Sequence, residues 1–292
     1  MIGQNPVVSI SCITFNHAPY IRECLDGFLM QKTTFPFEVV IYDDCSTDGT
    51  KEIIEEYTSK YPDIFFPMIQ TENQYSKGVR GMMARFNFPR CRGKYIALCE
   101  GDDYWTDSGK LQKQVGFLEN NPDFNLVGHY ALDSFGKTRG KHEKDTFAFE
   151  DIYYRNFIIP TASMVFRNNL VFPGWTSKIY GGDRAIIYLN AEKGKLKILP
   201  FMGSFYRIHE GGMEQVYKKD KFKLPIRNIN EEIVYYEQIK HLPKHYILSK
   251  RIVKNHLYIL AQSVGRFEMR YFFMAFYSLL LFLTVKQVKV KF

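Results

Sequence analysis

The sequence lacks the short motifs that define several large classes of nucleotide-binding and hydrolytic enzymes. No G-x-G-x-x-G follows the first predicted strand, which argues against a dinucleotide cofactor, and no G-x-x-x-x-G-K-[ST] is present, which excludes a P-loop enzyme. The absence of G-x-S-x-G weakens an assignment as a hydrolase. No internal repeat or low-complexity tract is found either, and the 46% of hydrophobic residues is ordinary for a folded protein.

Cysteine is scarce and irregularly spaced. The chain has an odd number of cysteines and no C-x-x-C pair, which argues against both a disulfide framework and a zinc site. Together with the lack of a signal peptide, this predicts reduced thiols, buried as small hydrophobic groups, in a cytoplasmic protein. The five cysteines are Cys12, Cys24, Cys45, Cys91 and Cys99.

The net charge of +8 is confined to the last quarter of the chain. Residues 216–292 contain 15 Lys and Arg against 5 Asp and Glu, whereas the first 215 residues contain 24 against 26. No nucleic-acid recognition motif accompanies this charge, so we expect no nucleic-acid partner. The sequence instead favours an anionic membrane surface or an anionic lipid-linked acceptor.

One short apolar segment lies near the end of the sequence. Tyr271–Val285, 15 residues without a charge, would form a helix of about 22 Å, shorter than the roughly 30 Å of bilayer hydrocarbon. Its aromatic residues and basic flanks predict that 271–292 lies at the inner surface of the membrane, as a peripheral anchor. Packing in the core or in a homodimer interface is the alternative.

Short apolar segments alternate with helical patterns over the first hundred residues. This alternation predicts an α/β domain whose mainly parallel sheet is covered by helices on both sides. Asn16 or His17 is expected to begin the first helix, which should run to about Lys32. The other predicted elements are strands at Val7–Thr14, Phe37–Asp44, Phe65–Gln70 and Lys94–Glu100 and helices near Thr50–Lys60 and Lys110–Asn120.

We expect two regions in the chain. The α/β domain should span residues 1–215, in two halves over 1–110 and 111–215. A basic helical region should follow over 216–292, because that segment reads as helix and carries the positive charge.

Polar residues follow three of the predicted strands where each strand ends. These clusters are Thr14–Phe15–Asn16, Asp43–Asp44–Cys45–Ser46 and Glu100–Gly101–Asp102–Asp103. Ligands of open α/β sheets collect beyond the carboxyl ends of the strands. Acidic clusters repel one another unless a cation or a donor-rich ligand lies between them, so the pattern predicts such a ligand at this edge.

The run VSISCITFNHAPYIRECLDGFLMQKTTFPFEVVIYDDCSTDGT, followed by GKYIALCEGDDYW, resembles the family 2 glycosyltransferases. The resemblance covers residues 7–120 closely and is looser to about 215. It implies that 1–110 is the nucleotide-sugar-binding half of the domain and 111–215 the acceptor-binding half. It implies the GT-A fold, a Rossmann-like sheet flanked by helices, and inverting sugar transfer from a nucleotide-diphosphate sugar, with UDP favoured. It also implies Mn²⁺ or Mg²⁺ as the cofactor, which suits carboxylate ligands.

The resemblance also assigns roles to the residues that bind the donor. Thr14, Phe15 and Asn16 look like the segment that contacts the base. Asp44 looks like the carboxylate that accepts a hydrogen bond from the base, and Ser46 lies beside it.

The acidic motif looks like the family's metal-and-ribose motif. Asp102 is assigned to the ribose and Asp103 to the divalent cation. The motif is Glu-Gly-Asp-Asp rather than Asp-x-Asp, which leaves the role of Glu100 open.

Three further residues are site candidates, each with a plainer alternative. Asp183, at the start of a predicted helix, resembles the catalytic base, but it could simply cap that helix. His209 resembles a histidine that approaches the metal or the diphosphate, beside a flexible Gly-Gly pair. Arg80 or Arg85 could add a positive charge near the diphosphate, or be an ordinary surface residue.

The chain has no Q-x-x-R-W motif and a single short apolar segment, which argues against a processive polymerase. We therefore expect transfer of one sugar to a glycan or lipid-linked saccharide, as in surface polysaccharide synthesis. A non-catalytic nucleotide-sugar binder and a sugar nucleotidyltransferase are the alternatives. The latter usually carries a Gly-rich loop after the first strand, where this chain has Phe15–Asn16–His17.

Overall fold

The structure is a computed structural model that describes residues 5–154, 159–179, 181–212, 215, 222–241, 246–266 and 268–285. The chain forms two compact units. The first comprises Met1–Ser177 and Gly182–Arg207, and the second comprises Lys178–Gly181 and Ile208–Phe292. The change of unit after Arg207 falls close to the expected boundary at 215.

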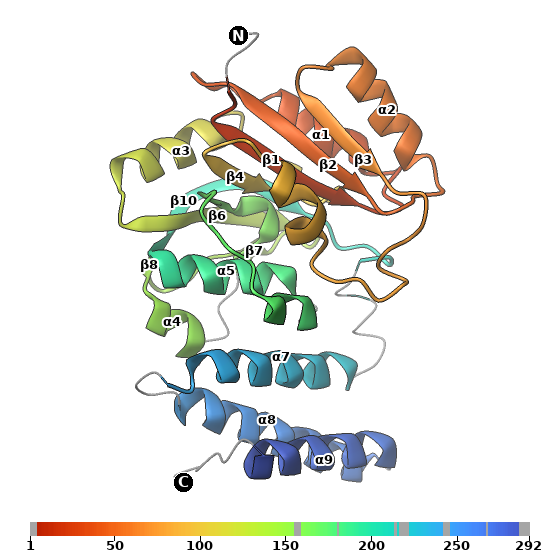
Figure 1. The fold of residues 1–292 in the computed structure, drawn as a ribbon, viewed down its shortest axis with the longest axis vertical. Coiled ribbons are helices and arrows are strands. Elements are labelled where there is room, and N and C mark those ends of the chain that lie inside the picture. Colours follow the sequence, from red (N-terminus) through yellow and green to blue (C-terminus); the bar gives the residue numbers. More distant parts are fainter. Residues whose placement is uncertain are drawn as a thin grey trace. The chain divides into compact units, whose positions relative to one another are not determined.

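A parallel half-sheet forms the start of the first unit. Its strands are β1 (Val8–Thr14), β2 (Phe37–Asp43), β3 (Phe65–Ile69) and β4 (Tyr95–Leu98), in the order β3-β2-β1-β4. The connecting helices are α1 (Ile21–Leu29) and α2 (Thr50–Lys60). Figure 1 shows β1, β2 and β3 side by side, with α2 next to β3. Because β1 pairs in parallel with both β2 and β4, all three strands end at one edge of the sheet.

The rest of the sheet is mixed. Strand β10 (Lys195–Tyr206) runs parallel to β6 (Phe124–Asp133), and β9 (Val165–Arg167) joins β4 to β6 by antiparallel pairing. The short strands β5 (Tyr104–Trp105), β7 (Thr138–Arg139) and β8 (Thr146–Phe147) add antiparallel pairs. The helices here are α3 (Lys110–Asn120), α4 (Phe149–Tyr154) and α5 (Gly182–Lys193), with single turns at Met83–Asn87, Phe88–Arg90, Thr161–Ser163 and Gly174–Lys178. The α/β fold class is therefore confirmed.

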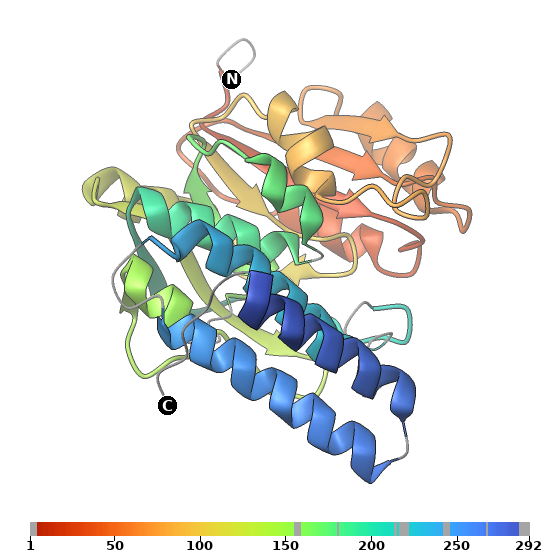
Figure 2. The same ribbon diagram turned by 60° about the horizontal axis from the view of Figure 1, so that its bottom comes forward.

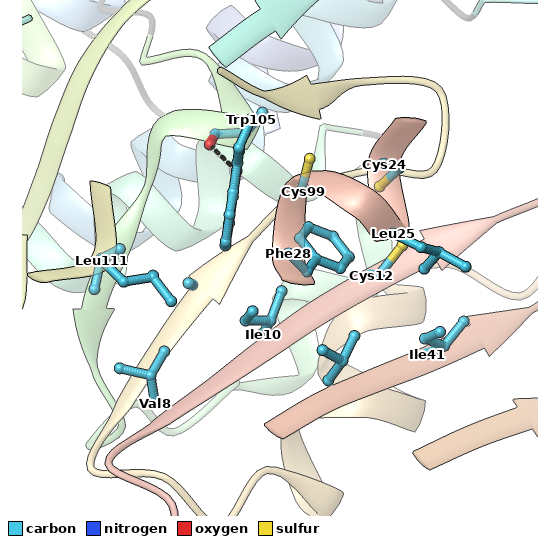
Figure 3. Packing of buried hydrophobic residues seen from close by; sticks show 14 of the residues in the cluster. Val8, Ile10, Cys12, Cys24, Leu25, Phe28, Ile41, Cys99, Trp105 and Leu111 are labelled. Atoms are coloured by element: carbon cyan, nitrogen blue, oxygen red, sulfur yellow. Dashed lines mark hydrogen bonds between the residues drawn. The ribbon is translucent and has the colours of Figure 1, made fainter. Parts of the chain in front are cut away.

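The main core lies between α1, α3 and the sheet. Val8, Ser9, Ile10 and Ser11 of β1 are all fully buried, as expected for a strand covered on both faces. Trp105 packs edge-on against Phe28, with 4.8 Å between ring centroids, and its Nε1 donates to the carbonyl of Ala162 at 2.8 Å. Figure 3 shows this packing, together with three of the cysteines. All five cysteines are free thiols, and only Cys45 is not fully buried.

The expected start of the first helix was wrong. Helix α1 begins at Ile21, because Asn16 adopts a left-handed conformation with φ of 53° and serves a loop instead. Its Oδ1 accepts a hydrogen bond from the backbone of Thr47 at 2.9 Å. The helix also ends at Leu29, before the expected Lys32. Helix α3 has the predicted bounds.

The second unit contains α7 (Lys223–Ile239), α8 (Tyr246–Gly265) and α9 (Met269–Val285). Helix α8 packs against both α7 and α9, and Figure 2 shows α8 and α9 side by side in opposite directions. The core of the second unit contains the buried residues Phe222, Ile229, Ile259 and Ala275. Among the described residues, no helix has the length and hydrophobicity needed to span a bilayer. Residues 286–292 of the predicted anchor lie outside the described residues.

The first residue of α3 is a buried cation. Lys110 is 0% exposed, and its Nζ lies 4.0 Å from the centroid of the Trp105 ring without a hydrogen-bond acceptor among the described residues. Burial lowers the pKa of Lys110 from 10.5 to about 7, opposed by Cys99 and Asp107. The folded chain therefore binds fewer protons at this site than the unfolded chain at every pH between these values.

We predict that Lys110→Met, which nearly conserves volume, stabilises the chain at pH 7. Since the unfolded state binds more protons above pH 7, this lysine makes wild-type stability rise with pH, by about 1 kcal/mol per pH unit from 7 to 9. The variant should lack that contribution. Urea unfolding of both proteins at several pH values measures the difference, and parallel curves for the two proteins would contradict the prediction.

Candidate active site

The acidic motif forms a tight turn directly after β4. The amide of Gly101 donates to the carbonyl of Ile13 at 2.9 Å, and the amide of Asp103 donates to the carbonyl of Glu100 at 3.0 Å. A Cβ atom at Gly101 would lie 2.7 Å from Oγ1 of Thr14. Glycine is thus required here, because only its lack of a side chain lets the turn pack against the end of β1.

Asp103 is a buried carboxylate with one oxygen unused. The residue is 2% exposed, and its Oδ1 accepts a hydrogen bond from the backbone of Arg207 at 2.8 Å. Its Oδ2 is buried and has no hydrogen-bond partner among the described residues. Burial, with a contribution from neighbouring Asp102, raises the pKa of Asp103 well above its usual range. An ionised Asp103 therefore calls for a positive partner at Oδ2.

Glu100 and Asp183 share the electrostatics of this turn. Burial raises the pKa of Glu100 to about 8, with further contributions from the charges of Asp102 and Asp183. Asp183 lies in the first turn of α5, a long way from Glu100 along the chain. The fold therefore brings the predicted base into electrostatic contact with the predicted metal motif.

The loops that follow β1 and β2 are tied together by side chains. The amide of Asn16 donates to Oγ of Ser46 at 2.8 Å, and that hydroxyl donates to Oδ1 of Asp43 at 2.5 Å. The amide of Ser46 donates to Oδ2 of Asp43 at 2.9 Å. Burial raises the pKa of Asp43 despite these hydrogen bonds. Ser46 therefore fixes the two loops, while Phe15 beside it stays 43% exposed.

Asp44 organises the loop that follows β3. Its Oδ1 accepts from the hydroxyl of Tyr42 at 2.7 Å and from the amide of Gln74 at 2.8 Å, and its Oδ2 accepts from the amide of Tyr75 at 3.0 Å. Arg80 lies over the ring of Tyr75, with Cζ 4.1 Å from the centroid, and donates to the carbonyls of Tyr75 and Val79 at 2.9 and 2.7 Å. The predicted residues Asp44 and Arg80 are thus joined through Tyr75.

His17 was not among the predicted site residues. Its Nε2 lies 3.8 Å from Oδ2 of Asp102, and its amide donates to Oγ1 of Thr50 at 2.8 Å. Its position directly after the predicted base-binding turn is a weak signal in the sequence that could have identified it. It connects that turn to the acidic motif.

Arg207 is the other residue that the sequence prediction missed. Its backbone amide binds Oδ1 of Asp103, its Nε donates to the carbonyl of Asp102 at 2.9 Å, and its guanidinium pairs with Glu23. The guanidinium also lies near the rings of Tyr20, Tyr104 and Phe205, at 4.7, 5.4 and 5.7 Å from their centroids. Arg207 thus holds the acidic turn in place through both its backbone amide and its side chain.

His209 belongs to the second unit. The amide of Gly212 donates to the carbonyl of His209 at 3.0 Å, so the Gly-Gly pair closes a turn around this histidine. Its contribution to the metal site stays a prediction.

The donor set of the acidic turn fits a divalent cation. Hard carboxylate oxygens suit Mg²⁺ or Mn²⁺. The buried Oδ2 of Asp103 lacks a partner among the described residues, and the neighbouring carboxylates of Asp102 and Glu100 raise the cost of its charge. A cation would satisfy this oxygen and relieve the repulsion.

The fold and this edge define an α/β protein with a cluster of acidic residues at the carboxyl ends of its parallel strands. Residues 9–176 match the family described as Glycosyl transferase family 2. The chain therefore belongs to glycosyltransferase family 2, and its resemblance to that family is confirmed.

Relatives of the chain agree with this membership. It is 36% identical to an uncharacterized protein of Mycobacterium tuberculosis over 214 residues, which cover 70% of this chain and 60% of that protein. The chain thus spans about 60% of the length of that relative. It is 26% identical over 230 residues to the Escherichia coli UDP-Glc:alpha-D-GlcNAc-diphosphoundecaprenol beta-1,3-glucosyltransferase WfaP, covering 77% of this chain and 84% of that enzyme.

Solved structures share the fold. Staphylococcus aureus TarS 1-349 in complex with UDP superposes with a TM-score of 0.57 at 17% identity, covering 92% of this chain and 89% of that one. The Pyrobaculum calidifontis mannosyltransferase PcManGT, in complex with GDP-Man and Mn²⁺, gives the same TM-score and identity over 90% and 76% of the two chains. Both likenesses support the GT-A fold.

We predict that Arg207→Lys weakens Mn²⁺ binding about tenfold, a typical loss when a group that orients a metal ligand is changed. Lysine keeps the charge and the backbone amide, but it cannot place one donor on Asp102 and another on Glu23. Calorimetric titration with Mn²⁺ and UDP measures the effect.

Arg139→Lys is the matched control, because Arg139 also pairs with a carboxylate, that of Asp133, and its Cζ lies 5.4 Å from the centroid of the Tyr206 ring. Equal losses in both variants, or none in Arg207→Lys, would contradict a specific role for Arg207.

Proposed function

We propose that the chain is an inverting, metal-dependent glycosyltransferase that moves one sugar from a UDP-sugar to a glycan or a lipid-linked saccharide. The observation that carries the proposal is the buried Oδ2 of Asp103, which has no hydrogen-bond partner in the described part of the chain and lies at the sheet edge where β1 and β2 also end. Membership in glycosyltransferase family 2 supports the reaction class.

The donor nucleotide would bind along the ends of β1 and β2. Thr14, Phe15 and Asn16 would contact the base, with the half-exposed Phe15 ring available for stacking. The Asp44 carboxylate accepts three hydrogen bonds and has capacity for about four, which leaves room for a base N–H. Ser46 would hold these two loops in register rather than bind the nucleotide directly.

The diphosphate would lie over the acidic turn. Asp103 and His209 would hold Mn²⁺ or Mg²⁺, and Asp102 would accept a hydrogen bond from the ribose. The cation would supply charge stabilisation for the departing nucleoside diphosphate. The Arg80 guanidinium donates to carbonyls of its own loop. It would add positive charge near the phosphates only if that loop turned toward them.

Asp183 would act as the general base. An inverting transfer needs a carboxylate that takes the proton from the acceptor hydroxyl as the sugar carbon is attacked. The charge of Asp183 already raises the pKa of Glu100, which supports a position beside the acidic turn. Transfer of the proton to Asp183 would remove that charge as the nucleoside diphosphate leaves.

The acceptor is proposed to be a lipid-linked saccharide or a glycan in surface polysaccharide synthesis. The name of the Escherichia coli relative describes a diphosphoundecaprenol-linked acceptor. A similar acceptor here would require the chain to work at the cytoplasmic face of the membrane.

We predict that Asp103→Asn lowers metal-dependent release of nucleoside diphosphate at least about 100-fold, since it removes the charge that holds the cation. The assay incubates the chain with Mn²⁺ and each of UDP-glucose, UDP-N-acetylglucosamine and GDP-mannose, and detects UDP or GDP. Release that persists at the wild-type rate in the variant, or in excess EDTA, would refute the metal assignment.

We predict that Asp183→Asn lowers kcat for sugar transfer by about 10²- to 10⁴-fold while leaving the donor Kd unchanged. The matched control is Asp151→Asn, because Asp151 also lies in the first turn of a helix, α4, and accepts a hydrogen bond from the amide of Ala148 at 2.9 Å. A merely capping Asp183 would affect thermal stability as Asp151 does and leave kcat intact.

A further inference from the structure

Helix α9 exposes a continuous apolar surface. Its buried side is small and includes Ala275 and Phe282, at 3% and 1% exposed. Apart from Arg270 and Thr284, the exposed side chains of the helix are large and apolar. They are Met269, Phe273, Met274, Phe276, Tyr277, Leu280, Leu281 and Leu283, exposed by 36% to 63%.

The last turns of α8 also expose apolar side chains. Leu257, Tyr258 and Val264 are exposed by 51%, 60% and 54%, and their spacing puts them on one face of the helix. Lys250 and Lys254 are exposed on the same face, at its amino-terminal end. Sequence reasoning had selected only the apolar run of α9, because the exposed residues of α8 are interrupted by buried ones.

The charge around this surface has one sign. From 246 to 285 the chain has five Lys and Arg and one acid, Glu268. Arg266 and Arg270 lie at the start of α9, and three lysines follow its end in the sequence. An apolar surface bordered by cations is complementary to an anionic lipid headgroup layer over hydrocarbon.

We propose that the exposed faces of α9 and of the end of α8 dock on an anionic bilayer surface. The 17 residues of α9 measure about 26 Å along the helix, less than the roughly 30 Å of hydrocarbon, so the helix lies in the interface. A second copy of the chain fits this surface less well. Self-association through α9 would bring basic helix ends together, with Glu268 as the only acid of the α8–α9 segment to offset them.

This inference deepens the proposed function by naming the surface that meets the membrane, but its test needs no catalysis. The full chain is mixed with vesicles of phosphatidylcholine, or of phosphatidylcholine with phosphatidylglycerol, and separated by flotation. We expect binding to the anionic vesicles and much less to the neutral ones. The double variant Phe273→Ser, Leu280→Ser should bind at least about tenfold more weakly, since both side chains are already exposed to water and their loss removes the inserted area.

Phe135→Ser is the matched control, because Phe135 is 78% exposed in the first unit. It should bind vesicles as the wild type does, and thermal unfolding should show all variants folded. The pair Arg266→Gln, Arg270→Gln should reduce binding to anionic vesicles alone and weaken its dependence on salt.

Equal flotation of the wild type and the Phe273→Ser, Leu280→Ser variant would overturn the proposal. A dimer seen by light scattering that this variant abolishes, without flotation of the wild type, would overturn it in favour of a second copy. Failure of sugar transfer with intact flotation would count against the proposed function only.

Discussion

The cost of burying carboxylates at the end of β4 governs the arrangement of the first unit. Asp103 is almost completely buried, and its neighbours Asp102 and Glu100 add negative charge. A buried anion is stable only when hydrogen bonds or an opposite charge compensate its lost hydration. The protein supplies one backbone amide, from Arg207, to one oxygen of Asp103. The lost hydration of the second oxygen of Asp103 is not compensated within the described residues, and this makes the turn suited to binding a cation.

The sheet topology brings the partners of this turn together. Strand β1 is central, so its parallel neighbours β2 and β4 deliver their following loops to the same edge. Ser46 then joins the loops of β1 and β2, and Gly101 lets the turn after β4 pack on Thr14. Each contact is local, yet together they fix three loops that are far apart in the chain. A sheet edge that is already rigid loses little conformational entropy when the proposed nucleotide binds.

The parts that the sequence predicted well are those with a local signal. Buried parallel strands read as continuous apolar runs, so β1, β2 and the bounds of α3 were found directly. The acidic turn was found because glycine and paired acids after a strand are unusual. Asn16 was misread as a helix start, since asparagine serves equally as a cap and in the left-handed conformation that it adopts here.

What the sequence could not give were the contacts made across long separations. Arg207 follows β10, and no local pattern links it to a turn a hundred residues earlier; only the pairing of β10 with β5 brings it there. Lys110 shows the same limit, because its position at the start of α3 is typical of a solvent-exposed residue, yet in the fold its Nζ lies over the ring of Trp105.

Asp103 and Lys110 both affect the pKa of the buried Cys99 thiol: Asp103 raises it and Lys110 lowers it. Each of the two side chains keeps a buried polar atom without a hydrogen-bond partner among the described residues. A buried ion pair adds little net stability because desolvation offsets the attraction, and a pair between Asp103 and Lys110 would have occupied the oxygen that makes the acidic turn a candidate metal site.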